Sequence, residues 1–279
     1  MVKQTLISEK QVAVYLKENQ SNLKSYGGAT LDIKEFLRGA MILIMDSAKL
    51  KHALTNEQGK TSLYNALKHG ASMGLSLNPI KKQACLIPYE FDGKIIIEYQ
   101  IMKDGYIQLA LDSGKVEYIT SDIVHENDAF KISKSMAGDE YLFSPALKDR
   151  GKIIGFFAAL KTINNIGHVK YMTVNEVNEI RDKYSAMYNK KKEKSPWTKS
   201  YSGMGLKTVL KALFRMLAFS SLKKAIESDD YFDFESPERN VTGTGSEELK
   251  DKIKKEADKK SKKVEKKPVP PDLRSKDLF

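Results

Sequence analysis

Residues 83–101, QACLIPYEFDGKIIIEYQI, decide the fold class of this protein. Gln83 to Tyr89 and Lys94 to Ile101 are strand-like runs, and the Asp92-Gly93 dipeptide between them is a strong signal for a tight turn. In the second run, four apolar residues alternate with three others, so that one face is apolar and the other is mixed: Ile95, Ile97, Tyr99 and Ile101 against Ile96, Glu98 and Gln100. The stretch therefore predicts an antiparallel β-hairpin.

Helical patterns precede this hairpin. Asp32 to Glu35 matches a capping box ahead of apolar residues that recur with a 3.6-residue period. A second run repeats that period, and Gly74 behind it is a typical helix stop. The residues of the two stripes are Phe36, Leu37, Ala40, Met41, Ile44 and Met45, then Leu63, Ala66, Leu67 and Ala71. We expect the first 75 residues to form a helical N-terminal layer.

Strand and helix patterns are mixed after the hairpin. Met102 to Leu111 reads as a helix that stops at Gly114, and Val116 to Val124 is rich in β-branched residues. Lys152 to Thr162 and His168 to Met172 predict a second hairpin, and Thr173-Val-Asn-Glu176 then caps a helix. Because helices and strands do not alternate as in parallel-sheet units, we expect an α+β fold of antiparallel hairpins packed with helices.

The composition changes beyond Asn240. Residues 241–279 begin with Gly, Thr and Ser, continue as a Lys/Glu-rich run and end in a Pro-rich segment followed by Asp272 to Phe279. Such a segment has too few apolar residues to form a core. We expect one domain over residues 1–240 and a flexible, disordered tail over residues 241–279. Its last residues could dock a partner, and a tail that only improves solubility fits equally well.

The charge favours a polyanionic partner. The chain of 279 residues carries a formal net charge of +11, and lysines and arginines that neutralise phosphates bind nucleic acid without reading its sequence. Ten basic residues between Met187 and Lys224 stand against the single acid Glu193. Such segregation is more informative than the total charge.

The single cysteine and the hydropathy pattern suggest a compartment. Cys85 excludes a disulfide framework and fits a reducing environment. No apolar run is long enough for a transmembrane helix, and the stretch from Met1 to Lys10 lacks a signal-peptide core. We therefore expect a cytoplasmic protein that does not bind membranes.

Signals for enzymatic chemistry are weak. Gly59-Lys60-Thr61 resembles the end of a phosphate-binding loop, but Leu54 occupies the position of its first glycine. The four histidines are scattered without metal-ligand spacing. A metal-dependent nuclease would need clustered carboxylates, and Asp92, Glu98 and Asp104 are candidates by position only, since Asp92 belongs to a turn signal and Asp104 to a helix start. We expect no catalytic residue, no bound metal and no ATP.

One predicted helix, Met204 to Lys224, combines an apolar stripe with a basic ridge. Lys207, Lys211 and Arg215 are four residues apart and would project as one line that is offered to phosphates. An ordinary amphipathic helix with a solvated basic face is the alternative. Tyr184, Tyr188, Trp197 and Tyr201 are interleaved with nearby lysines, and such rings can stack on bases.

Further candidates flank the first hairpin. Lys81 and Lys82 precede it, and Lys103, Tyr106 and Gln108 follow it. Tyr106 shares a face with apolar residues and is expected to be buried, which makes Lys103 the better phosphate ligand. The complete set of expected DNA-binding residues is Lys81, Lys82, Lys103, Tyr106, Gln108, Trp197, Lys199, Tyr201, Lys207, Lys211 and Arg215.

Two segments resemble the RecT family of phage recombination proteins. One is Gly105-Tyr-Ile-Gln-Leu-Ala-Leu111, which follows a strand pair containing Ile87-Pro88-Tyr89. The other is Ser195-Pro-Trp197 through Tyr201, Met204 and Lys207-Thr-Val-Leu-Lys211. The family commonly reads Ser-Pro-Trp, a spacer, an aromatic residue and Met-Ala-Lys-Lys-Thr, with an Arg three residues on. Here Gly205 replaces the Ala, Leu206 the first Lys and Lys211 the Arg. The order and spacing match from about Leu63 to Leu222.

The resemblance implies a non-enzymatic, ATP-independent protein that anneals complementary DNA strands during phage homologous recombination in a bacterial host. It also implies a ring or helical filament of identical subunits with single-stranded DNA or annealed duplex in a long basic groove. A cognate 5′ to 3′ exonuclease and the host single-strand binding protein are the implied partners, and Mg²⁺ would assist annealing only indirectly.

Two other classes stay open from the residues alone. A metal-dependent DNA-processing nuclease would share the DNA substrate. A generic nucleic-acid-binding protein, including one that prefers structured RNA, would share the basic charge.

Overall fold

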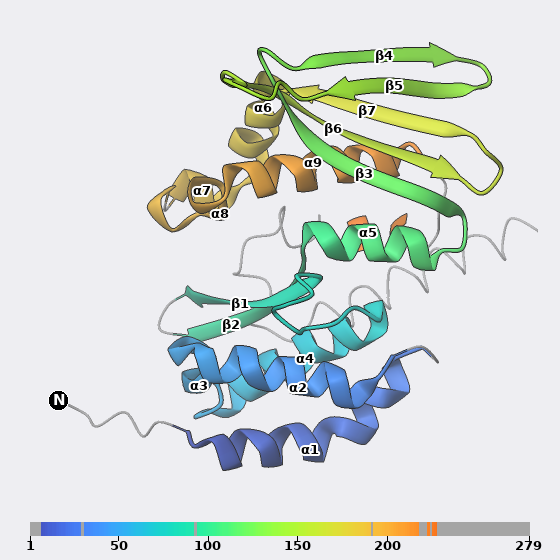
Figure 1. Ribbon diagram of the computed structural model, residues 1–279. Coiled ribbons are helices and arrows are strands. Elements are labelled where there is room, and N and C mark those ends of the chain that lie inside the picture. Colours follow the sequence, from blue (N-terminus) through green and yellow to red (C-terminus); the bar gives the residue numbers. More distant parts are fainter. Residues whose placement is uncertain are drawn as a thin grey trace, which may run out of the picture. The chain divides into compact units, whose positions relative to one another are not determined.

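The structure is a computed structural model, which describes residues 7–28, 31–91, 94–190, 192–217, 222–223 and 225–227. The expected turn at Asp92-Gly93, the expected tail over residues 241–279, and Lys191 and Lys224 lie outside the described residues. The described chain is α+β, with antiparallel strand pairs and helices as expected (Figure 1).

Four helices form the predicted N-terminal layer: α1 (Glu9–Tyr26), α2 (Ile33–Asp46), α3 (Ala48–Ala53) and α4 (Glu57–Met73). Gly74 ends α4 in the left-handed conformation with φ of 72°. Asp32 caps α2, since its carboxylate accepts hydrogen bonds from the backbone N–H groups of Lys34 and Glu35. The carboxylate of Glu35 instead contacts Ser76 and Lys81. The Asp32 side chain thus caps the helix as predicted, but the Glu35 side chain does not make the reciprocal hydrogen bond of a capping box.

The predicted first hairpin consists of β1 (Ala84–Phe91) and β2 (Lys94–Ile101), which pair antiparallel with Ala84 opposite Ile101. Helix α4 packs against β2, and the Tyr99 ring meets the His69 ring edge-on at 5.5 Å. Ile96 and Glu98 on the other face are also buried. Both faces of β2 are therefore covered, although the alternation predicts that only one of them is apolar.

A second sheet follows α5 (Lys103–Asp112) and contains β3 (Val116–His125), β6 (Ile153–Thr162) and β7 (Gly167–Thr173) in the order β3-β6-β7. All its pairs are antiparallel, which confirms the second predicted hairpin. Helix α6 (Val174–Tyr184) begins at the predicted capping box, in which Thr173 and Glu176 bind each other's backbone N–H groups.

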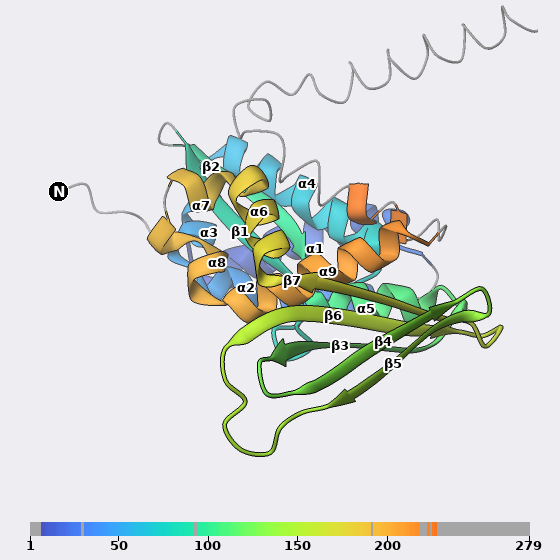
Figure 2. The ribbon, with the colours of Figure 1, turned by 90° about the horizontal axis from the view of Figure 1, so that it is seen from above.

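A third hairpin, which the sequence patterns do not predict, joins β4 (Ala129–Ser135) to β5 (Gly138–Ser144). It lies over one face of the second sheet (Figure 2). Phe130 and Phe143 place their rings 4.8 and 5.0 Å from that of Phe157 in β6, and Phe130 also meets Tyr171 at 5.3 Å. These contacts make a small aromatic core separate from the main one.

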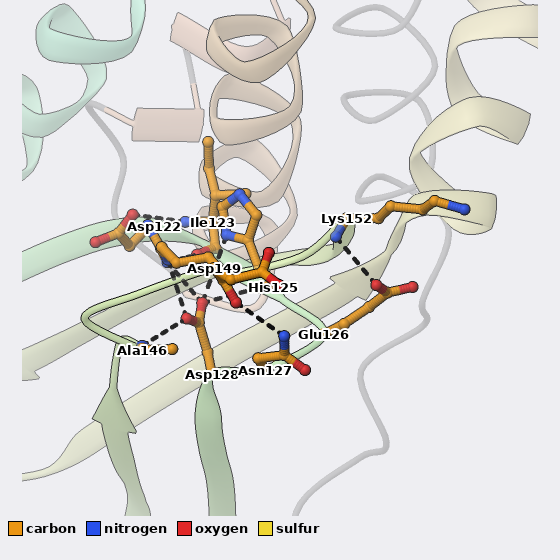
Figure 3. A network of polar contacts seen from close by, with 10 residues as sticks. Asp122, Ile123, His125, Glu126, Asn127, Asp128, Ala146, Asp149 and Lys152 are labelled. Atoms are coloured by element: carbon orange, nitrogen blue, oxygen red, sulfur yellow. Dashed lines mark hydrogen bonds and ion pairs between the residues drawn. The ribbon is translucent and has the colours of Figure 1, made fainter.

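Asp128 holds the two ends of this hairpin segment together (Figure 3). Its carboxylate pairs with the Arg150 guanidinium at 2.6 and 2.9 Å, and it accepts hydrogen bonds from the backbone N–H groups of His125 and Ala146. The Arg150 guanidinium also donates to the carbonyl oxygen of Ile123. Chiefly because of the bonds from Arg150, the pKa of Asp128 lies well below its usual range.

The last described elements are α7 (Ala186–Lys190), a 3₁₀ turn η1 (Lys192–Lys194), α8 (Pro196–Lys199) and α9 (Tyr201–Arg215). The prediction of one helix from Met204 to Lys224 is wrong at both ends, because the helix starts three residues earlier and its cap is Met216. Helix α9 packs against β6, β7, β3 and α5. None of the helices within the described ranges has the length and apolarity needed to cross a membrane.

Candidate nucleic-acid interface

Lys81 and Lys82 lie on the turn that connects α4 to β1. The ammonium group of Lys81 pairs with the Glu35 carboxylate at 2.6 Å, and nearly half of its side chain is exposed. Lys82 is exposed and has a φ of 49°, in the region that residues with a side chain seldom adopt. The turn thus presents two cations, one of which is paired with a helix behind it.

Gln83 connects this turn to α5. Its backbone oxygen accepts a hydrogen bond from the N–H group of Met102 at 2.9 Å, and its side-chain amide donates to the side chain of Gln108 at 3.3 Å. Lys103, at the start of α5, pairs with Asp104. The structure therefore brings the predicted residues on the turn and on α5 into adjacent segments.

Tyr106 joins α5 to α9. It is fully buried, as predicted, and its ring stacks on Phe214 with the centroids 6.2 Å apart. The ammonium nitrogen of Lys207 lies 5.9 Å from the centroid of the same ring. A tyrosine in this position holds two helices together and has no exposed face for a base.

The predicted basic ridge on α9 is not a solvent-facing line. Lys207 and Lys211 are only 8% and 7% exposed, whereas Arg215 is exposed. The physical reason is that α9 has neighbours on both sides. Gly205 faces the Phe156 ring of β6, and α5 covers the side that carries Lys207. The expectation of a solvent-facing basic ridge is therefore wrong for the first two.

Trp197 and Tyr201 pack against neighbouring elements, although the sequence offers both as rings that can stack on bases. Trp197 is 6% exposed, and the Tyr201 ring lies 6.1 Å from it and 5.8 Å from Phe156. The Tyr201 hydroxyl donates to the side-chain oxygen of Asn178 at 3.0 Å, and its burial raises the Tyr201 pKa. These two rings fix α8 and α9 against the second sheet and α6.

Cation–ring pairs on α6, α7 and η1 involve Tyr184 and Tyr188, two rings that the sequence offers for stacking but that are outside the expected set of DNA-binding residues. The Arg181 guanidinium lies 4.3 Å from the Tyr188 ring centroid, with Lys192 5.3 Å from the same ring. Lys183 lies 5.0 Å from the Tyr184 ring. Both rings are half-buried, and four lysines around them are exposed: Lys183, Lys190, Lys192 and Lys199. In the sequence, the signal for this set is the presence of Tyr184 and Tyr188 among several lysines between residues 181 and 199.

The described residues contain no cluster of three or more His, Cys, Asp or Glu side chains arranged to hold a metal ion. Glu98 is buried in β2, Asp104 pairs with Lys103, and Asp92 lies outside the described residues. Gly59 to Thr61 belongs to the first turn of α4, whose cap is Asn56, and not to a loop after a strand. These placements favour neither a nuclease site nor a phosphate-binding loop.

Comparison with known proteins gives a match to the RecT family over residues 34–242, which is more than half of the chain. The chain belongs to the RecT family. Both motif segments lie inside the matched range, so the resemblance that they carry is confirmed.

This RecT family protein is similar to two individual proteins. It is 28% identical to YqaK of Bacillus subtilis (strain 168) over 172 residues, which cover 61% of this chain and 56% of YqaK. It is 22% identical to Protein RecT of Escherichia coli (strain K12) over 212 residues, which cover 71% of this chain and 77% of that protein. The chain therefore spans little more than half the length of YqaK.

Proposed function

We propose that this RecT family protein is a non-enzymatic annealing protein of phage homologous recombination. It binds single-stranded DNA and promotes pairing of complementary strands without ATP. The match to the RecT family over residues 34–242 is the observation that carries this proposal. The net charge of +11 supports it, because a protein that holds DNA by its backbone needs cations more than base-specific contacts.

Annealing imposes simple physical demands. Two strands repel each other through their phosphates, and lysine and arginine side chains reduce that repulsion while they grip the backbone. Phosphate contacts carry no base identity, so the base edges stay free to test partners. Watson–Crick pairing then supplies the specificity.

The exposed cations in and around the predicted DNA-binding segments are the proposed phosphate ligands. They fall on the turn before β1, on α6 to α8 and at the end of α9: Lys81, Lys82, Lys183, Lys190, Lys192, Lys199 and Arg215. Lys103, with a third of its side chain exposed, extends the set onto α5. The rings of Tyr184 and Tyr188 are the proposed stacking surfaces, since base–ring stacking tolerates any sequence. Tyr106, Trp197, Tyr201, Lys207 and Lys211 position the helices that carry these groups.

The assembly and its partners are proposals of the same kind. We expect a homo-oligomer, as a ring or helical filament, because annealing long strands needs many subunits side by side in one basic groove. A cognate 5′ to 3′ exonuclease would supply the single strands. In the bacterial cytoplasm, the host single-strand binding protein would coat these strands and so contact the annealing protein. Mg²⁺ is expected to act only on the repulsion between strands.

The test is strand annealing with purified full-length protein. Two complementary labelled oligonucleotides are mixed without nucleotide triphosphate, once with Mg²⁺ and once with EDTA, and duplex formation is followed against the spontaneous rate. We expect acceleration in both buffers and intact strands on a denaturing gel. Tight DNA binding with no acceleration would reduce the protein to a plain single-strand binder.

Strand integrity in the same experiment tests the first rival class, and competition binding with structured RNA tests the second. Strand scission that needs Mg²⁺ and is lost on changing one carboxylate would establish a nuclease. Preferential binding of structured RNA over single-stranded DNA would establish a general RNA-binding protein.

A further inference from the structure

An exposed isoleucine stands at the centre of the turn that carries Lys81 and Lys82. Ile80 is 88% exposed, and two cations follow it directly in the chain. Single exposed apolar residues are common and need no function by themselves. Ile80 differs from the others because of how firmly its turn is held and which groups surround it.

Hydrogen bonds fix the turn on its N-terminal side. The side-chain oxygen of Asn78 accepts from the N–H group of Ile80 at 3.0 Å, and its backbone oxygen accepts from the N–H group of Lys81 at 3.0 Å. The Ser76 hydroxyl accepts from the N–H group of Asn78 at 3.1 Å. Pro79 locks one backbone torsion between them. Side chains that bind their own backbone in this way hold a turn in one shape.

Tertiary contacts anchor the same turn to its neighbours. Lys81 pairs with Glu35 of α2, and the N–H group of Ser76 donates to the side chain of Gln83 at 2.8 Å. Gly39 of α2 lies so close to the backbone of Asn78 that an added Cβ would stand 2.6 Å from its nitrogen. The Ile80 side chain is thus presented on a rigid support, which removes much of the ordering cost of an insertion.

Backbone strain at Lys82 also indicates that the surrounding structure holds this turn in one conformation. A φ of 49° in a residue with a long side chain costs energy, and such outliers persist where the surrounding structure over-determines them. The turn thus carries an apolar residue followed directly by two cations, beside the segment that Gln83 ties to α5. Apolar side chains presented next to cations are the means by which some DNA-binding proteins open a stack of bases.

We propose that Ile80 is a wedge that inserts between two neighbouring bases of the bound single strand while Lys81 and Lys82 hold the flanking phosphates. This inference rests on the proposed function and adds a positioning role to it. A wedge at a fixed site in each subunit divides the strand into short stacked groups. Bases in such groups keep their edges exposed for pairing, whereas a freely collapsed strand hides them.

The test compares Ile80→Ser with the conservative Ile80→Leu and with Leu147→Ser, a control at a residue that is fully exposed on another loop. Each full-length variant is bound to single-stranded DNA that contains 2-aminopurine, whose fluorescence rises when the base loses a stacked neighbour. We expect the rise with the unmodified protein, Ile80→Leu and Leu147→Ser, and its loss with Ile80→Ser.

Affinity and salt dependence give a second readout. Ile80→Ser should bind single-stranded DNA about three- to tenfold more weakly, with an unchanged salt slope, because an apolar contact and no phosphate contact is lost. Lys82→Ala should instead lower the salt slope by about one. Unchanged affinity and unchanged 2-aminopurine fluorescence in Ile80→Ser would overturn the wedge.

The same series of variants tests which molecule the Ile80 side chain contacts. If Ile80→Ser lowers the oligomer mass in sedimentation without DNA and leaves the 2-aminopurine signal intact, the side chain contacts a second copy of the chain and the proposal is wrong. If the unmodified protein fails to accelerate annealing, the proposed function falls. If it anneals normally and Ile80→Ser does the same with the signal intact, only the wedge falls.

Discussion

The ammonium nitrogen of Lys207 lies 5.9 Å from the ring centroid of Tyr106, and through this contact a cation of α9 packs against α5. Lys207 is 8% exposed and Tyr106 is fully buried. A lysine in such a place contributes its aliphatic stem to packing as well as its charge to the ring. Its first role is therefore to hold α5 and α9 together.

Lys207→Ala is predicted to lower the free energy of unfolding by about 1–3 kcal/mol, because a buried side chain with a cation–ring contact is removed. Lys199→Ala, at an exposed position, should change stability by less than about 0.5 kcal/mol and lower the salt slope of DNA binding by about one. Urea unfolding and salt-dependent binding check both variants. Full stability together with a reduced salt slope in Lys207→Ala would place this lysine on DNA.

Gly205→Ala is predicted to destabilise the protein by about 1–3 kcal/mol, because the added Cβ would overlap the Phe156 ring in β6. Gly203→Ala on the same helix would meet only the Ser200 hydroxyl and should be neutral or stabilising by up to about 1 kcal/mol. Combining Gly205→Ala with Phe156→Leu should recover part of the loss in a double-mutant cycle. Additive losses in the double variant would contradict this account.

Asp128→Asn is predicted to lower the free energy of unfolding by about 2–3 kcal/mol at neutral pH, because Arg150 loses its charged partner. The folded-state pKa of Asp128 lies below its unfolded value of about 4. Its carboxylate therefore stabilises the fold above that pH, and the contribution is lost as the pH falls through the lower folded-state pKa. Urea unfolding between pH 7 and pH 3 should show a smaller loss of stability on acidification in Asp128→Asn than in the unmodified protein.

Tyr99→Phe is predicted to leave stability unchanged or to raise it by up to about 1 kcal/mol. The Tyr99 hydroxyl is buried and has no hydrogen-bond partner among the described residues. Its removal therefore eliminates the free-energy cost of burying an unpaired polar group. Tyr15→Phe is the matched control, since that hydroxyl donates to the Lys60 carbonyl at 2.8 Å and its loss should cost about 1 kcal/mol. Thermal unfolding that ranks the two variants in the opposite order would refute the assignment.

The local elements could be predicted because each has a local signal. The first predicted hairpin has alternating residues and a turn dipeptide, the second has two strand-like runs close together, and α6 has a capping box that the structure confirms. The β4–β5 hairpin is not predicted because its turn, around Met136 and Ala137, has no strong dipeptide signal.

The candidate site could be predicted only in part, because burial is a property of the tertiary fold. A spacing of four residues places Lys207, Lys211 and Arg215 along one line of α9. Nothing local indicates that α5 comes to cover the first part of that line. The burial of Tyr106, in contrast, follows from the apolar residues on its own helix face, and the structure confirms it.

The Asp128–Arg150 pair closes a loop whose two ends already belong to one ladder. The N–H group of Glu126 donates to the carbonyl of Lys152 at 3.0 Å, so β3 and β6 continue toward each other up to the point where the β4–β5 hairpin departs. Residues 127–151 are therefore an insertion between two strands that would form an ordinary hairpin without it. Because both ends of the segment leave the ladder at one point, a change in its length does not by itself shift the register of β3 against β6.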